Sequence, residues 1–237
     1  AVYYGNNVSN TIQLLNHAVD AGVKNFIFSS SSSVYGDVED YPVTEDTDGN
    51  PTSPYGRSKA IIEQILPDYE KYGLNWTSLR YFNVAGADPE GTSGYTQEPA
   101  THFIPILAKA VVNGDRMSIN GNDYDTADGT CERDFTHVFD IATAHLAAMN
   151  YLSDGGENGC FNIGSNNPYS LIQVIAEMET VSGKTIHYEF AGRREGDVVK
   201  TFANTDKAQK AFGWEPVYSM QDILTHALEW ETNKKKK

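Results

Sequence analysis

Apolar positions along the chain follow two patterns, helical spacing and short continuous runs. Over residues 6–21, Val8, Ile12, Leu15 and Val19 fall on one face of a predicted helix. The same spacing predicts further helices over residues 54–72, 102–113, 136–152, 170–183 and 219–232. The short apolar runs predict buried strands over residues 23–28, 75–84, 160–164 and 185–190.

Helices and short apolar strands alternate along most of the chain. This alternation is typical of an α/β fold with a doubly wound parallel sheet. Residues 121–135 are mostly polar and predict a loop. The sequence shows no internal repeat and no low-complexity linker.

The chain is acidic, which argues against some classes of binding partner. Lys and Arg total 18, Asp and Glu total 32, and the formal net charge is −14. Binding to nucleic acid is not expected, because phosphate contacts need a basic surface. Mean hydropathy is −0.46, and no apolar run approaches the length of a membrane span. Neither a membrane partner nor a signal peptide is expected.

The chain has two cysteines, Cys131 and Cys160, without a CxxC pair or metal-ligand spacing. This usage indicates a reducing compartment, so we expect a cytoplasmic protein with no bound metal.

Five consecutive serines, Ser29–Ser33, follow the predicted strand over residues 23–28. Serine runs are commonly flexible surface loops. Alternatively, they mark the carboxyl end of a parallel strand, where open α/β sheets place ligand-binding groups. The run alone does not decide between these interpretations.

Tyr55 and Lys59 are four residues apart near the start of the predicted helix over residues 54–72. This spacing places both side chains on one helix face. A nearby ammonium lowers the pKa of a phenol, which can then act as a general base. Tyr-x-x-x-Lys pairs are common by chance, but this one follows a serine-rich strand end, which favours a catalytic site.

Several motifs in order, FSSSSSVYG, SPYGRSK, LRYFNVAGADP, GNDYDTADGTCERDFTHV, FNIG and AGRREGD, resemble the extended short-chain dehydrogenases/reductases. Within that family they are similar to the UDP-glucose 4-epimerases. The resemblance implies a Rossmann-type fold and NAD-dependent epimerisation of a UDP-hexose at C4, in galactose and carbohydrate metabolism. Related dehydratases carry an Asp-Glu pair where this chain has Ser32 and Ser33, which argues against dehydration.

The resemblance also implies a role for each catalytic residue. Ser31 hydrogen-bonds the sugar 4-hydroxyl, and Tyr55 takes its proton while C4 gives a hydride to NAD. The resulting 4-keto sugar then turns over and takes the hydride back on its other face. Lys59 holds the cofactor ribose and lowers the pKa of Tyr55. Asn6 and Phe82 are implied as further cofactor contacts.

Substrate contacts are implied at seven positions: Ser33, Asn83, His102, Arg133, Arg194, Asp197 and Thr201. The arginines suit a diphosphate, because guanidinium groups recognise phosphate oxygens. Arg133 could instead be a buried ion-pair partner, and Arg193 is expected to be a plain surface charge. Thr201 lies at a position where, in similar epimerases, a bulky tyrosine excludes an N-acetyl group and a small residue admits it. The alternative function is therefore that of a UDP-N-acetylhexosamine 4-epimerase, or of another sugar-nucleotide enzyme of the family.

Two domains are expected from the resemblance. Residues 1–83, with a return segment over about 135–165, form the second half of an NAD-binding Rossmann domain. Residues 84–134 and 166–237 form a substrate-binding domain. A homodimer is expected because family members commonly pair.

The chain has no glycine-rich dinucleotide turn. The resemblance implies roughly 90 further residues, about three βα units, ahead of residue 1. Two explanations stay open: the sequence is a fragment of an ordinary epimerase, or it is a truncated, non-catalytic protein that binds nucleotide sugars or depends on a partner.

Overall fold

The computed structural model describes residues 2–194 and 196–234, and it contains two compact units. The first unit comprises Ala1–Phe82, Ala142–Asn166 and Phe202–Glu215. The second comprises Asn83–Ile141, Asn167–Thr201 and Pro216–Lys237. None of the described helices is long and apolar enough to cross a membrane.

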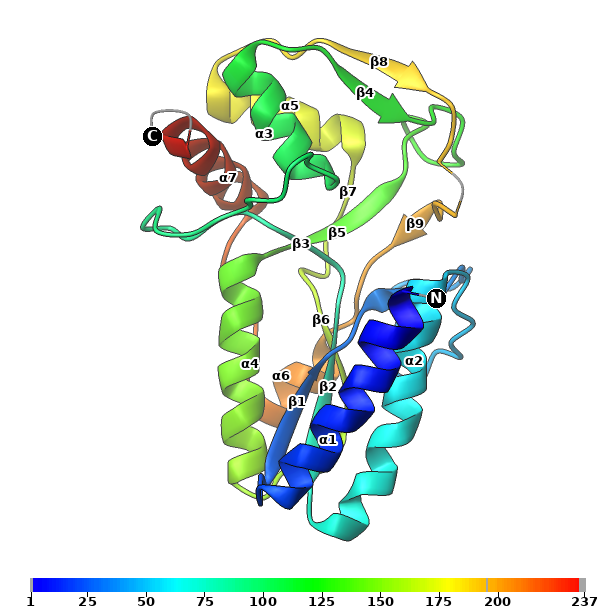
Figure 1. Ribbon diagram of the computed structural model, residues 1–237. Helices are drawn as coiled ribbons and strands as arrows, with labels where there is room; N and C mark the ends of the chain where they lie inside the picture. The colour runs from blue at the N-terminus through cyan, green and yellow to red at the C-terminus, as the bar shows by residue number, and fades with distance from the viewer. Residues whose placement is uncertain (1, 195, 235–237) are drawn as a thin grey trace. The chain divides into compact units, whose positions relative to one another are not determined.

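The first unit is built on a three-stranded parallel sheet in the order β1-β2-β6. Its strands are β1 (Asn25–Ser29), β2 (Asn75–Tyr81) and β6 (Gly159–Ile163). Helices α1 (Asn10–Asp20) and α2 (Pro54–Ile65) cover one face, and α4 (Val138–Ser153) runs along the other (Figure 1). Parallel strands with helices on both faces confirm the predicted doubly wound α/β fold.

The predicted apolar face of the first helix points into the core of this unit. Leu15 is fully buried against Ile62, Leu66 and Trp76, and Val8, Ile12 and Val19 pack around them. The chain enters α1 through a π-helical turn, Tyr4–Ser9. The predicted helix over residues 54–72 changes to a 3₁₀-helix at Leu66–Tyr72, where Pro67 lacks a backbone N–H.

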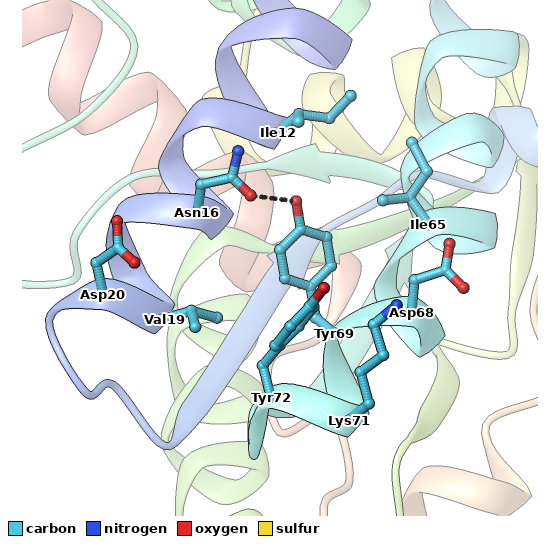
Figure 2. A pocket seen from close by; sticks show the side chains of 9 residues that line it. All are labelled: Ile12, Asn16, Val19, Asp20, Ile65, Asp68, Tyr69, Lys71 and Tyr72. Atoms are coloured by element: carbon cyan, nitrogen blue, oxygen red, sulfur yellow. Dashed lines mark hydrogen bonds between the residues drawn. The ribbon is translucent and has the colours of Figure 1, made fainter.

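A groove lies between α1 and the 3₁₀-helix (Figure 2). Its volume is about 750 Å³, and Ile12, Val19 and Ile65 supply apolar lining. The Tyr69 hydroxyl donates a hydrogen bond to Asn16 Oδ1 at 2.9 Å across the groove floor. Tyr72 lies beside it and is 59% exposed.

The second unit contains a mixed sheet around β5 (Glu132–His137), which pairs with β3 (Asn83–Ala85), β7 (Pro168–Ser170) and β9 (Lys200–Thr201). A separate parallel pair joins β4 (Met117–Asn120) and β8 (Tyr188–Ala191). Helices α3 (Phe103–Asn113), α5 (Leu171–Ser182) and α7 (Met220–Lys234) enclose its core. Ser170 and Gln173 form a capping box that begins α5.

Several sequence predictions differ from this structure. The run over residues 75–84 is two strands in different sheets, β2 and β3, with Phe82 between them. The predicted loop over 121–135 ends earlier, because Glu132–His137 pairs with three neighbouring strands as β5. The sequence patterns missed β4, β7, β9 and α6 (Asp206–Phe212).

The two units also depart from the predicted domain segments. Phe202–Glu215 belongs to the first unit, because Ala203 pairs with Val43 and the Phe212 ring lies 5.0 Å from the Phe161 ring of β6. Residues 135–141 belong to the second unit, where β5 ends. The functional roles assigned to the two domains stay predictions.

Candidate active site

The serine run is an ordered strand end in the first unit. Ser30 and Ser31 are buried at the carboxyl end of β1, and Ser32–Val34 forms a 3₁₀ turn. Ser31 Oγ accepts a hydrogen bond from the Ser33 backbone N–H at 3.2 Å and lies 3.2 Å from Ser33 Oγ. The flexible-loop interpretation is therefore wrong.

The start of α2 approaches this turn closely. A Cβ atom at Gly56 would lie 2.2 Å from the Ser33 carbonyl oxygen, so only glycine permits this approach. Ser53 caps the helix by accepting a hydrogen bond from the Gly56 N–H at 3.0 Å. This packing brings the Tyr55 side chain close enough to the Ser31 hydroxyl for Ser31 to lower the pKa of the phenol.

Lys59 lies on the same helix face as Tyr55, as its spacing predicts. Its Nζ is 5.6 Å from the centre of the Tyr55 ring and donates a hydrogen bond to the Ser29 carbonyl at 2.7 Å. The structure thus brings Ser31, Tyr55 and Lys59 together at one strand end.

The pKa of Tyr55 departs from the prediction. Burial raises it, and the nearby Ser31 hydroxyl only partly opposes that effect. Burial also lowers the pKa of Lys59. The Lys59 ammonium donates its hydrogen bond to the Ser29 carbonyl. Desolvation of the Tyr55 phenol is the largest effect on its pKa, so the net shift is upward.

Two tyrosines that sequence reasoning missed surround this group. The Tyr3 ring packs edge-on against Tyr55 at 5.8 Å, and Tyr81 lies close enough to Ser29 for that residue to lower the pKa of the Tyr81 phenol. Burial raises the pKa of Tyr81 as well. Tyr81 ends β2, which is adjacent to β1, so its place at the carboxyl edge of the predicted sheet was an available signal.

The first unit fits the nicotinamide side of a dinucleotide. Ser30 Oγ is buried at the strand end with no hydrogen-bond partner among the described residues, and the half-buried ammonium of Lys59 lies one helix turn from Tyr55. Asn6 is exposed on the π-helical turn, whereas Phe82 is buried with Val34 and Tyr35. The cofactor contacts of Asn6 and Phe82 stay predictions.

Five of the predicted substrate residues line one cavity in the second unit. Asn83, His102, Arg133, Arg194 and Asp197 surround a volume of about 190 Å³. They come from β3, the residue before α3, β5 and the connection between β8 and β9. Residues far apart in sequence thus converge on a single polar cavity.

Arg133 is both a cavity residue and an ion-pair partner. Its Nη2 lies 3.6 Å from Asp197 Oδ1, and its Nη1 donates a hydrogen bond to the Glu132 carbonyl at 2.9 Å. Thr201 of β9 is the register partner of Arg133. The buried Arg133 and the exposed Arg194 both line this cavity, so their two guanidinium groups could each bind phosphate oxygens.

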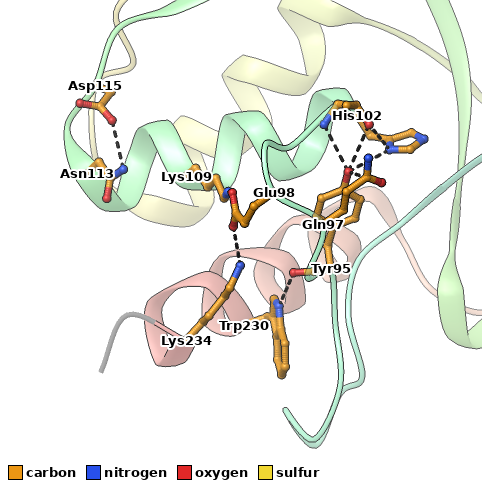
Figure 3. Close-up of polar contacts among 10 residues, drawn as sticks. Tyr95, Gln97, Glu98, His102, Lys109, Asn113, Asp115, Trp230 and Lys234 are labelled. Carbon is orange, nitrogen blue, oxygen red and sulfur yellow. Dashed lines mark hydrogen bonds and ion pairs between the residues drawn. The ribbon is translucent and has the colours of Figure 1, made fainter. Parts of the chain in front are cut away.

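His102 sits at the edge of this cavity and contacts Tyr95, as Figure 3 shows. The two rings pack edge-on at 5.7 Å, and the Thr101 N–H donates a hydrogen bond to the Tyr95 hydroxyl at 3.2 Å. Trp230 Nε1 donates to the Tyr95 carbonyl at 2.9 Å, which fixes this loop on α7. No spacing in the sequence pointed to Tyr95.

The chain is similar to known proteins over nearly its whole length. The model of the NAD dependent epimerase/dehydratase family matches residues 1–164. A UDP-glucose 4-epimerase of Rhizobium meliloti (strain 1021) is 42% identical over 236 residues, which cover 99% of this chain and 72% of that protein.

Solved structures show the same likeness. One is the UDP-glucose-4-epimerase of Stenotrophomonas maltophila, solved with bound NAD and formylated UDP-arabinopyranose. Its TM-score is 0.94 and its sequence identity is 32%, and the match covers 98% of this chain and 70% of that chain. The UDP-Glc/GlcNAc 4-epimerase of Campylobacter jejuni has a TM-score of 0.80 and 39% identity, over 97% of this chain and 71% of its own. The resemblance read from the sequence is therefore confirmed, and the chain belongs to the NAD dependent epimerase/dehydratase family.

Proposed function

We propose that the protein catalyses the NAD-dependent epimerisation of a UDP-hexose, UDP-glucose or UDP-galactose, at C4 of the sugar. The observation that carries this proposal is that Ser31, Tyr55 and Lys59 meet at the carboxyl end of a parallel sheet, with Lys59 Nζ 5.6 Å from the centre of the Tyr55 ring and hydrogen-bonded to the Ser29 carbonyl. Ligand sites of open α/β sheets lie at this end. Membership of the family supplies the reaction class.

In this reaction Tyr55 accepts the proton of the sugar 4-hydroxyl, and Ser31 orients that hydroxyl through its Oγ. When bound beside these residues, NAD would supply a reversible hydride acceptor for C4 of the sugar, which allows the configuration at C4 to be inverted through a 4-keto sugar. Lys59 supplies a positive charge 5.6 Å from the Tyr55 ring, which favours the phenolate against its burial. Lys59 and Ser30 would also bind the nicotinamide ribose.

The cavity of the second unit would bind the UDP group. Arg133 and Arg194 are proposed to bind the diphosphate, because planar guanidinium forks match phosphate oxygens. Asp197 would accept hydrogen bonds from the ribose, and Asn83 and His102 would contact the phosphates or the sugar. Ser33 is proposed as a second hydroxyl close to the sugar.

The test is an assay of product formed from UDP-galactose with added NAD. Epimerisation predicts UDP-glucose with no net accumulation of NADH, because the hydride returns to the same sugar. A 4-keto-6-deoxy product would indicate dehydration, and stoichiometric NADH would indicate a dehydrogenase. Either result contradicts the proposal.

A second candidate activity is epimerisation of UDP-N-acetylglucosamine and UDP-N-acetylgalactosamine. Thr201 is a small residue and the register partner of Arg133 on the neighbouring strand. A small side chain at this position would leave room for an N-acetyl group that a tyrosine would exclude. A structural neighbour acts on both Glc and GlcNAc forms according to its name. We expect the wild type to convert both substrate pairs.

Replacing Thr201 by tyrosine checks this expectation. Thr201→Tyr should lower the N-acetyl activity relative to the UDP-glucose activity by at least about tenfold, since even one methylene in a pocket can change discrimination by about 10- to 200-fold. Thr201→Ser is the control and should keep the ratio. An unchanged ratio in Thr201→Tyr would show that this position does not select the sugar.

We also propose that the protein is a cytoplasmic homodimer. The two free cysteines suit a reducing compartment. The groove between α1 and the 3₁₀-helix combines apolar lining and the exposed ring of Tyr72 with the charged residues Asp20, Asp68 and Lys71, and it offers a surface that a second copy could bury.

A further inference from the structure

Two predicted substrate residues, Arg194 and Asp197, lie on the connection between β8 and β9 in the second unit. The residue before Arg194 is Arg193, which the sequence suggests is a plain surface charge. Its side chain is half-exposed but makes three contacts with one loop. The connection between β8 and β9 is therefore held in place by contacts outside the cavity as well as by residues that line it.

The three contacts join Arg193 to Asp123 and Tyr124. Arg193 Nε donates a hydrogen bond to Asp123 Oδ1 at 2.7 Å, and Nη2 donates to the Asp123 carbonyl oxygen. The guanidinium carbon lies 4.2 Å from the centre of the Tyr124 ring. Stacking on the Tyr124 ring and hydrogen bonding to Asp123 together fix both the position and the orientation of the Arg193 guanidinium.

The opposite loop is shaped to receive this stack. Tyr124 is buried, and a Cβ atom at Gly121 would lie 2.4 Å from its ring and 3.0 Å from Arg193 Cγ. The Gly121 N–H also donates a hydrogen bond to the Ala191 carbonyl at 2.9 Å. Glycine at this position, with φ of +78°, therefore permits both the turn and the stack.

We propose that Arg193 is a positioning residue: its contacts with Asp123 and Tyr124 hold the connection so that Arg194 and Asp197 face the diphosphate and ribose of the substrate. This inference rests on the proposed function. Arg193 acts through its neighbours, so its loss should weaken the binding of UDP without adding to the loss of Arg194 and Asp197 themselves.

The experiment measures UDP affinity by calorimetry in the purified chain. Arg193→Ala should raise the Kd for UDP about tenfold, a typical coupling between residues in contact. In an Arg194→Ala, Asp197→Asn background, adding Arg193→Ala should change the Kd less than about twofold. A merely structural residue would add its full effect in both backgrounds, and that result would overturn the proposal.

Conservative variants separate the stack from general damage. Tyr124→Phe keeps the ring and should leave the Kd unchanged, whereas Tyr124→Leu should match Arg193→Ala. Arg193→Lys keeps the charge without the planar fork and should recover only part of the affinity. Equal losses in Tyr124→Phe and Tyr124→Leu would overturn the stacking role.

The two proposals fail in different ways. If the wild type does not bind UDP, or if Arg194→Ala binds it normally, the proposed function and this inference both fall. If Arg194→Ala loses affinity while Arg193→Ala does not, only the positioning role of Arg193 is contradicted.

Discussion

Burial controls the proton affinity of Tyr55, the residue at the centre of the proposed chemistry. Its pKa is raised by desolvation, so the phenol is protonated near neutral pH in this structure. A proton acceptor in the reaction needs positive charge close to the ring. Lys59 supplies one such charge, and an oxidised nicotinamide would supply another.

His137 illustrates the same effect in a residue outside the proposed chemistry. It is fully buried, and its Nδ1 accepts a hydrogen bond from the Phe139 N–H at 3.0 Å. The ring proton must therefore lie on Nε2, which is 3.0 Å from His226 Nδ1. Burial and the neighbouring His226 lower the pKa of His137 to about 4.

This pKa predicts a loss of stability in acid. The unfolded histidine titrates near pH 6.5, so between pH 6.5 and about 4 the unfolded chain binds more protons than the native one. Stability should fall by roughly 3 kcal/mol as the pH drops through this window. The measurement is denaturant unfolding across the window.

The control is His137→Gln, which cannot titrate. Its free energy of unfolding should depend less on pH between 6.5 and 4 than that of the wild type. Equal pH dependence in the two proteins would show that His137 is not the group responsible.

At the scale of elements, the approach of α2 to the end of β1 positions the proposed catalytic residues. Gly56 permits that approach, since a side chain there would meet the Ser33 carbonyl. We expect Gly56→Ala to push α2 away, destabilise the fold by about 1–3 kcal/mol, and separate Tyr55 from Ser31. Turnover should fall by at least about tenfold, because small misplacements of catalytic groups are costly.

Gly5→Ala provides a matched control, because a Cβ atom at Gly5 meets nothing within 4 Å. It should leave turnover and stability close to those of the wild type. Normal turnover in Gly56→Ala would contradict the importance of this close approach.

The sequence patterns predicted the helices and strands that are long or that have recognisable capping residues at their ends. The helix expected over residues 170–183 is observed as Leu171–Ser182, with a capping box at one end and Gly183 in a left-handed conformation at the other. β7 and β9 have three and two residues, too few to show any periodicity. The apolar run over 75–84 shows that strands are present but not that the chain changes sheet at Phe82.

The candidate site was predictable to the same extent. Tyr55 and Lys59 are one helix turn apart, so their proximity follows from local spacing. Arg193 and Asp123 are 70 residues apart, and Tyr95 and Trp230 are 135 apart. Only the tertiary fold brings such pairs together, and therefore neither was found from the sequence.

For the whole molecule, the proposed homodimer is open to direct test. Sedimentation velocity should show a species of twice the chain mass of 26.1 kDa at micromolar concentration. Tyr72→Glu places a charge beside the groove of Figure 2 and should shift the protein toward monomer. Tyr188→Glu, on β8 of the second unit, is the control. A monomeric wild type would contradict the dimer.

In the proposed C4 epimerisation, Tyr55 transfers the proton of the sugar hydroxyl. The most direct measurement compares turnover of UDP-galactose by the wild type and by Tyr55→Phe, both supplied with NAD, with Tyr188→Phe as the control for the loss of a tyrosine hydroxyl elsewhere. Removing an acid–base group typically lowers turnover by about 10² to 10⁴. We predict a loss of that size in Tyr55→Phe, with normal thermal unfolding and a normal Tyr188→Phe. Turnover near the wild-type level in a folded Tyr55→Phe protein would contradict this role of Tyr55.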